Sequence, residues 1–151
     1  VVIGRGGAAI AREDAWDHVW GFTIVNDLTA RDKQKLHQQW FLGKSLPGFC
    51  PMGPVIVAKE HMPRPIALRT RVNGALRQQC DDCLATLIFP VEELIATISE
   101  CIPLQPGDVL ATGTPKGVGA GMKPEPQFLR PGDSVEVEVS GLGTLRSAIV
   151  A

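Results

Sequence analysis

The organisation of the chain is clearest in residues 21–34, which read Gly21-Phe22-Thr23-Ile24-Val25-Asn26-Asp27-Leu28-Thr29-Ala30-Arg31-Asp32-Lys33-Gln34. Phe22–Val25 is a short apolar run rich in residues that favour strands, and it predicts a strand that ends at Asn26-Asp27. Leu28–Gln39 is polar and predicts one or two helical turns. A rigid strand fixes the direction of the side chains at its end, so the Asp27 carboxylate is well placed to bind a ligand.

The elements on either side predict further short strands and helices. Val1–Gly4 reads as a strand, and Glu13–Trp20 reads as a short amphipathic helix that ends at Gly21. After the Pro51–Pro54 turn, Val55–Ala58 predicts another strand.

The clearest hairpin signal lies in the middle of the chain. Ile66–Val72 alternates apolar and polar residues, Asn73-Gly74 follows, and Ala75–Arg77 leads away, which predicts a hairpin with a type I′ turn. Pro90–Ser99 predicts a helix, because Pro stands at its start, acidic residues fill its first turn and apolar residues recur at helical spacing.

The same turn sequence, Pro-Gly-Asp, occurs twice in the last third of the chain. Pro106-Gly107-Asp108 predicts a turn into a strand over Val109–Thr112, and Pro131-Gly132-Asp133 predicts one into the Val/Glu-alternating strand Ser134–Val139. A final strand is expected near Thr144–Val150. Many short strands and few short helices indicate an α+β fold, mainly β, with one core and one domain over residues 1–151.

Composition excludes several classes of protein. Fifteen Lys and Arg against sixteen Asp and Glu give a formal charge of −1, whereas a nucleic-acid binder normally carries a basic excess. We find neither an apolar run of membrane-spanning length nor a signal-peptide pattern, so we expect no membrane partner. Four cysteines without framework spacing are typical of reduced thiols, which favours a cytoplasmic protein.

Three motifs contain residues that could bind a ligand or act in catalysis, and each could instead have a purely structural role. Asp27 could be a metal ligand, or Asp27 or Thr29 could cap the following helix. Lys44, in Gly43-Lys44-Ser45, could polarise an anionic intermediate or could be a solvated lysine. Thr112–Gly119 is dense in Gly and hydroxyl groups that could hold an anion, or it is a loop; it lacks both Gly-rich nucleotide-binding patterns.

The pair Cys80 and Cys83 forms a CxxC motif. A zinc site needs a second ligand pair, which does not follow, and a redox pair needs a strand before it and a helix after it. We therefore interpret these residues as loop thiols. The three histidines show no metal-binding spacing, and no serine-hydrolase motif is present.

Taken together, the motifs resemble those of the fumarylacetoacetate hydrolase family, in its catalytic, C-terminal domain. The matching stretches, in chain order, are Val2–Arg5, Gly21–Gln34, Gly43–Ser45, Phe49–Pro54, Arg71–Gly74 and Pro106–Gly119. The resemblance implies a β-roll of mixed sheets, commonly in a homodimer. It also implies a Mg²⁺- or Mn²⁺-dependent hydrolase, isomerase or decarboxylase of 2-oxo or 2,4-dioxo acids, such as acylpyruvates, oxaloacetate or aromatic ring-cleavage products like 2-hydroxyhepta-2,4-diene-1,7-dioate.

The same resemblance assigns roles residue by residue. Asp27 falls on a metal ligand, Arg31 and Gln34 fall on substrate-binding positions, Lys44 falls on the catalytic lysine, and Thr114 falls on a substrate-binding threonine. Such a cation prefers oxygen ligands and would stabilise the enolate formed when a bond beside the keto group breaks. The positive charge of Lys44 would act where that oxyanion develops.

The chain departs from the family pattern in two ways, and these departures leave rival hypotheses for its function open. Two of the family's three metal-binding carboxylates come from a Glu-x-Glu just before the first strand, and a His and Glu pair lies further upstream, so we expect the chain to lack this N-terminal segment. The stretch Gln79–Phe89 is also unusual in carrying cysteines. The rival hypotheses are a non-catalytic member of the fold that binds a ligand or dimerises, and a thiol or zinc module centred on Cys80 and Cys83.

Overall fold

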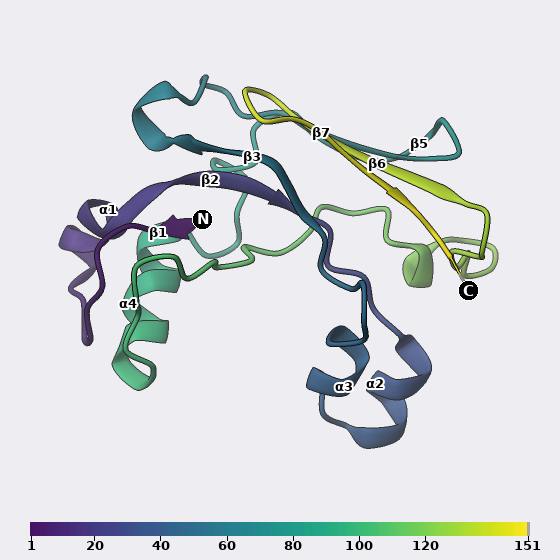
Figure 1. Cartoon of the computed structure of the whole chain (residues 1–151), viewed down its shortest axis with the longest axis horizontal. Helices are drawn as coiled ribbons and strands as arrows, with labels where there is room; N and C mark the ends of the chain where they lie inside the picture. The colour runs from purple at the N-terminus through teal and green to yellow at the C-terminus, as the bar shows by residue number, and fades with distance from the viewer. Residues whose placement is uncertain (151) are drawn as a thin grey trace.

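The computed structural model describes residues 1–150, with the exception of the His37 side chain. It shows two antiparallel sheets with helices at their edges (Figure 1). The first sheet has the order β1-β2-β3, from Val2–Ile3, Val19–Val25 and Met52–Ala58. The second has the order β5-β4-β6-β7, from Ala75–Cys80, Leu68–Val72, Ser134–Val139 and Gly143–Ala148.

The helices are short. The α-helices are α1 (Ala15–His18), α2 (Arg31–His37), α3 (Phe41–Lys44) and α4 (Val91–Cys101). The 3₁₀ turns are η1 (Arg12–Asp14), η2 (Lys59–His61) and η3 (Gly119–Gly121). The expected α+β, mainly β class is confirmed. The strand pairings in residues 1–150 are all antiparallel rather than mixed, because no helix here serves as a crossover between neighbouring parallel strands.

One core joins the first sheet, α4 and the inner face of the second sheet. Ile3 and Ile95 are fully buried, and the alternate residues Val135, Val137 and Val139 of β6 point into the same cluster. The intervening Glu136 and Glu138 face outward and pair with arginines on β7 and β4. The Val/Glu alternation therefore predicts this strand and its buried face correctly.

The expected helix over Glu13–Trp20 is too long. Helix α1 ends at His18, and Val19 and Trp20 open β2, where Val19 pairs with Ile3. Gly21, expected to end the helix, lies inside β2. A Cβ at Gly21 would lie 2.1 Å from the carbonyl oxygen of Val57, so glycine allows β3 to approach.

The expected strand over Val109–Thr112 reduces to one bridge between Val109 and Val2. The backbone N–H of Ile3 donates to the Asp108 carbonyl and that of Leu110 donates to the Val1 carbonyl, so the segment does run along β1. A two-residue strand offers too few partners for a longer ladder. The hairpin β4–β5, helix α4 and the last two strands appear where the sequence predicts them.

Candidate functional site

The chain between β2 and β3 leaves the sheet and folds into a small lobe that contains α2 and α3, which we call the α2–α3 lobe (residues 26–51). Figure 1 shows this lobe standing apart from both sheets. Gly43 lets its two helices meet: a Cβ there would lie 3.0 Å from both the Ala30 carbonyl oxygen and the Gln34 Cβ, and the Ala30 N–H donates to the Gly43 carbonyl. This contact brings Lys44, the last residue of α3, back to the end of β2.

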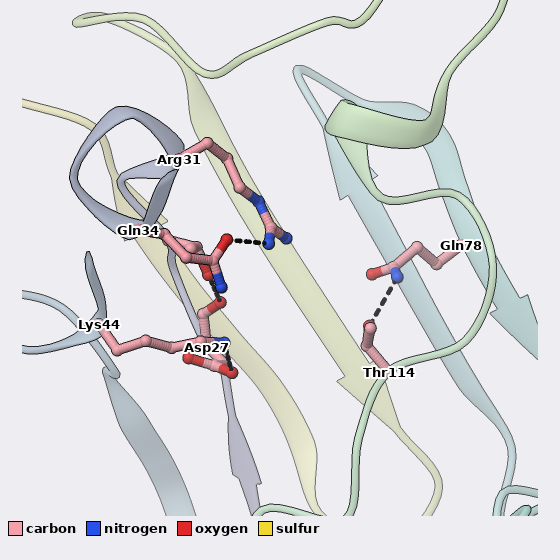
Figure 2. Close-up of polar contacts among 7 residues, drawn as sticks. Asp27, Arg31, Gln34, Lys44, Gln78 and Thr114 are labelled. Carbon is pink, nitrogen blue, oxygen red and sulfur yellow. Dashed lines mark hydrogen bonds and ion pairs between the residues drawn. The ribbon is translucent and has the colours of Figure 1, made fainter. Parts of the chain in front are cut away.

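The Lys44 ammonium forms an ion pair with the Asp27 carboxylate, and Arg31 Nη1 donates to Gln34 Oε1 at 2.8 Å (Figure 2). The side chains of Lys44 and Asp27 are 29% and 43% exposed, so the pair is open to water. The structure thus brings four of the five predicted site residues together in one lobe. The alternative that Asp27 or Thr29 caps the next helix is wrong, because Ala30 is the N-cap of α2 and no side chain bonds there.

Thr114, the fifth predicted residue, lies on a different segment. Its hydroxyl contacts Gln78 Nε2 of β5 at 2.8 Å, and the same amide nitrogen lies 2.8 Å from the Pro115 carbonyl oxygen. Figure 2 shows the Gln78–Thr114 contact apart from the four residues of the lobe. Leaving aside the His37 side chain, which the structure does not describe, no hydrogen bond or ion pair joins Thr114 to the lobe.

The described residues do not by themselves fit a divalent cation. Among the side chains that the structure describes, which leave out His37, no three His, Cys, Asp or Glu gather in a way that could hold a metal. Asp27 is one carboxylate, and a lysine ammonium already neutralises it. Mg²⁺ bound by a protein usually has more oxygen ligands than this, or a phosphate from its substrate.

Two further polar residues contact or adjoin the predicted site residues, and the sequence motifs do not identify them as part of the site. Gln78 is the first, and the only sequence signal for it is a polar residue directly after the predicted hairpin residues Ala75–Arg77. Asn26, next to Asp27, is the second: its Nδ2 is buried and has no hydrogen-bond partner among the described residues. A buried donor without a partner is costly, so this amide is available to a ligand.

No further metal ligands gather around the CxxC residues among the described side chains. All four cysteines are free. Cys80 is the last residue of β5 rather than part of a loop, and its Sγ lies 3.0 Å from Thr86 Oγ1. Burial, with a smaller contribution from Cys80, raises the pKa of the Cys83 thiol to about 12, which disfavours the thiolate that metal binding and exchange both need.

No helix in residues 1–150 has the length and apolar character needed to cross a membrane. The sequence model described as Fumarylacetoacetate (FAA) hydrolase C-terminal matches residues 1–150. The chain belongs to the fumarylacetoacetate hydrolase family. The motifs quoted above therefore identify the family correctly.

Individual relatives add detail. The chain is 52% identical over 151 residues to the oxaloacetate tautomerase YisK of Bacillus subtilis, covering 99% of this chain and 49% of that protein. The solved fumarylacetoacetate hydrolase of Exiguobacterium antarcticum is 45% identical with a TM-score of 0.92, over 99% of this chain and 53% of its own. The fumarylpyruvate hydrolase of Pseudomonas aeruginosa, solved in complex with Mn²⁺ and pyruvate, is 33% identical with a TM-score of 0.83, over 99% and 62%. This chain spans about half the length of the curated relatives that it matches.

Proposed function

We propose that this chain is the substrate-binding part of an enzyme that hydrolyses, isomerises or decarboxylates a 2-oxo or 2,4-dioxo acid. The observation that carries the proposal is the α2–α3 lobe, which gathers one carboxylate, one ammonium, one guanidinium and one amide from two separate motifs. A tautomerase of oxaloacetate and a hydrolase solved with pyruvate, both similar to this chain, support a small 2-oxo acid as the substrate class.

Each residue has a role in this proposal. Arg31 and Gln34 bind the polar end of the substrate, and the Thr114 hydroxyl donates to a substrate carboxylate. Lys44 places a positive charge where an enolate oxygen develops, and such a charge stabilises the transition state. Arg31 suits a carboxylate because its planar guanidinium can donate two parallel hydrogen bonds.

A Mg²⁺ or Mn²⁺ ion is part of the proposal, with Asp27 as one ligand and the remaining carboxylates supplied from outside residues 1–150. When bound, such an ion polarises the keto oxygen of a 2-oxo acid. The Mn²⁺ in the fumarylpyruvate hydrolase complex supports this requirement. We also propose a homodimer, supported by the exposed apolar side chains of Met52, Val55 and Ile56 on the edge strand β3.

The test is an assay of the full-length protein, with Mg²⁺ or Mn²⁺, against oxaloacetate, acylpyruvates and ring-cleavage dioates. We expect turnover of at least one class, and we expect Asp27→Ala to abolish it. Unchanged turnover in Asp27→Ala would rule out the ligand role.

The second candidate is a non-catalytic member of the family that binds a ligand without turnover. The single carboxylate of the lobe favours it, because one carboxylate binds the cation only weakly. No turnover of any of the three substrate classes, together with pyruvate binding that depends on Arg31, would select this candidate.

A further inference from the structure

Gln78 lies in the middle of β5, on a different segment from all the residues that the family motifs point to. Its side-chain Nε2 makes two contacts of 2.8 Å, one with the Pro115 carbonyl oxygen and one with Thr114 Oγ1 (Figure 2 shows the second). Gln78 is half-buried, whereas Thr114 is exposed and within reach of a ligand.

These two contacts determine the direction of the Thr114 hydrogen bond. A backbone carbonyl only accepts, so the side-chain atom of Gln78 that faces Pro115 must be the NH₂ nitrogen. That nitrogen only donates, so Thr114 Oγ1 is the acceptor in the second contact. The single hydroxyl hydrogen of Thr114 is therefore left for another acceptor.

The loop that carries Thr114 also touches β5 at a second point. A Cβ on Gly117 would lie 2.0 Å from the carbonyl oxygen of Arg77, the residue before Gln78, so the loop backbone lies directly on the strand. Gln78 thus acts on a loop that is already seated, and its amide sets hydrogen-bond polarity in addition to position. We call Gln78, Thr114, Pro115 and Gly117 the β5 clamp.

We propose that Gln78 is a positioning residue that makes the Thr114 hydroxyl an obligate donor to a ligand carboxylate. The proposal rests on the role of Thr114 in the proposed function. A carboxylate fits because it carries acceptors only, and a hydroxyl held as a donor binds it without first reorienting. A ligand that offered only a donor at this point would meet a second donor.

The experiment uses the 151-residue chain with pyruvate as the probe, followed by NMR titration. We expect Thr114→Val to weaken pyruvate binding by about tenfold to hundredfold, because a hydrogen bond to a charged group is lost. Gln78→Met keeps the length of the side chain but cannot donate, and we expect a loss of about threefold to tenfold. Gln78→Glu can only accept from Thr114 and should lose at least as much as Thr114→Val.

Gln79 provides the matched control. It is the next residue of β5, and its amide bonds to Asp81 rather than to the loop. We expect Gln79→Met to leave pyruvate affinity within twofold of the wild-type value. In a Thr114→Val background, Gln78→Met should add no further loss, whereas a purely structural role would lower affinity again.

The outcomes separate the two claims. If Thr114→Val leaves affinity unchanged, or pyruvate fails to bind the wild-type chain, the proposed role of Thr114 fails and this inference fails with it. If Thr114→Val weakens binding but Gln78→Met and Gln78→Glu do not, only the inference is overturned. Additive losses in the double variant would also overturn it.

Discussion

In the α2–α3 lobe the functional groups bind one another, with Lys44 on Asp27 and Arg31 on Gln34. In the β5 clamp a side chain outside the predicted set, Gln78, binds the functional residue Thr114 and leaves its hydrogen free. A ligand must displace internal partners in the lobe, whereas it meets a free donor at the clamp.

The two regions also differ in how they are held. The clamp loop lies on a strand of the four-stranded sheet, and its approach depends on the absence of a Cβ at Gly117. The lobe stands apart from the sheets and exposes Leu36, Trp40 and Phe41. A side chain at Gly117, where the clamp loop lies on β5, should therefore cost stability. Substitution of a polar side chain in the lobe should cost binding with little loss of stability.

The largest expected effect is that of Gly117→Ala. The new Cβ would meet the Arg77 carbonyl, and Gly117 has φ of +108°, so we expect a loss of about 3 kcal/mol or more in the free energy of unfolding by urea. Gly113→Ala is the control, since φ there is +104° but nothing lies within 4 Å. We expect it to cost about 1 kcal/mol from backbone strain alone. Equal losses at the two positions would contradict close packing of the loop on β5.

Arg31→Met tests the lobe. We expect pyruvate affinity to fall by about tenfold to hundredfold, because hydrogen bonds between charged groups are lost. The free energy of unfolding should fall by less than about 1 kcal/mol, because the half-buried Arg31 side chain bonds to Gln34 of the same helix. Arg146→Met, which removes an exposed arginine paired with Glu136 on the second sheet, should leave pyruvate affinity unchanged. A large loss of stability in Arg31→Met would remove the contrast between the two regions.

Lys44→Met tests the ion pair of the lobe. Both side chains are partly exposed, so we expect the metal-free chain to lose at most about 1 kcal/mol of stability, and less at high salt. In an Asp27→Asn background the same substitution should cost nothing more. A salt-independent loss of several kcal/mol would show that the pair is part of the folded core.

The smallest expected effect concerns acid stability at Asp133, in the turn that leads into β6. The hydrogen bond from Asn73, followed by that from the Arg130 N–H, lowers the pKa of Asp133 below 3.8. A lowered folded-state pKa contributes stability above the unfolded value that is lost as pH falls through the folded one. Chemical unfolding between pH 7 and pH 2 should show a smaller decrease in stability for Asp133→Asn than for the wild type. An identical decrease in both proteins would rule out this contribution.

The sequence predicts the parts of the fold that local chemistry determines. Asn73-Gly74 takes positive φ at both positions, as a type I′ turn requires, and the two Pro-Gly-Asp turns each place an aspartate that accepts from a backbone N–H three residues earlier. The sequence does not predict the start of β2, because Val19 joins this strand by pairing with Ile3. Local periodicity carries no information about a contact between residues so far apart in the chain.

In the candidate site, too, local motifs are predictable from the sequence, whereas contacts between distant residues are not. The motifs identify Asp27, Arg31, Gln34 and Lys44, but not that Lys44 would neutralise Asp27, since that contact depends on how α3 folds back. Gln78 could not be recognised, because its importance comes from a loop 36 residues away in the chain.

The most direct test of this account is a titration of the 151-residue chain with Mn²⁺, followed by the electron paramagnetic resonance of free Mn²⁺. With one carboxylate already paired to an ammonium, we expect a dissociation constant in the millimolar range, and we expect Asp27→Asn to remove the binding. A micromolar dissociation constant would contradict the claim that this chain carries the substrate-binding groups but not a complete metal site.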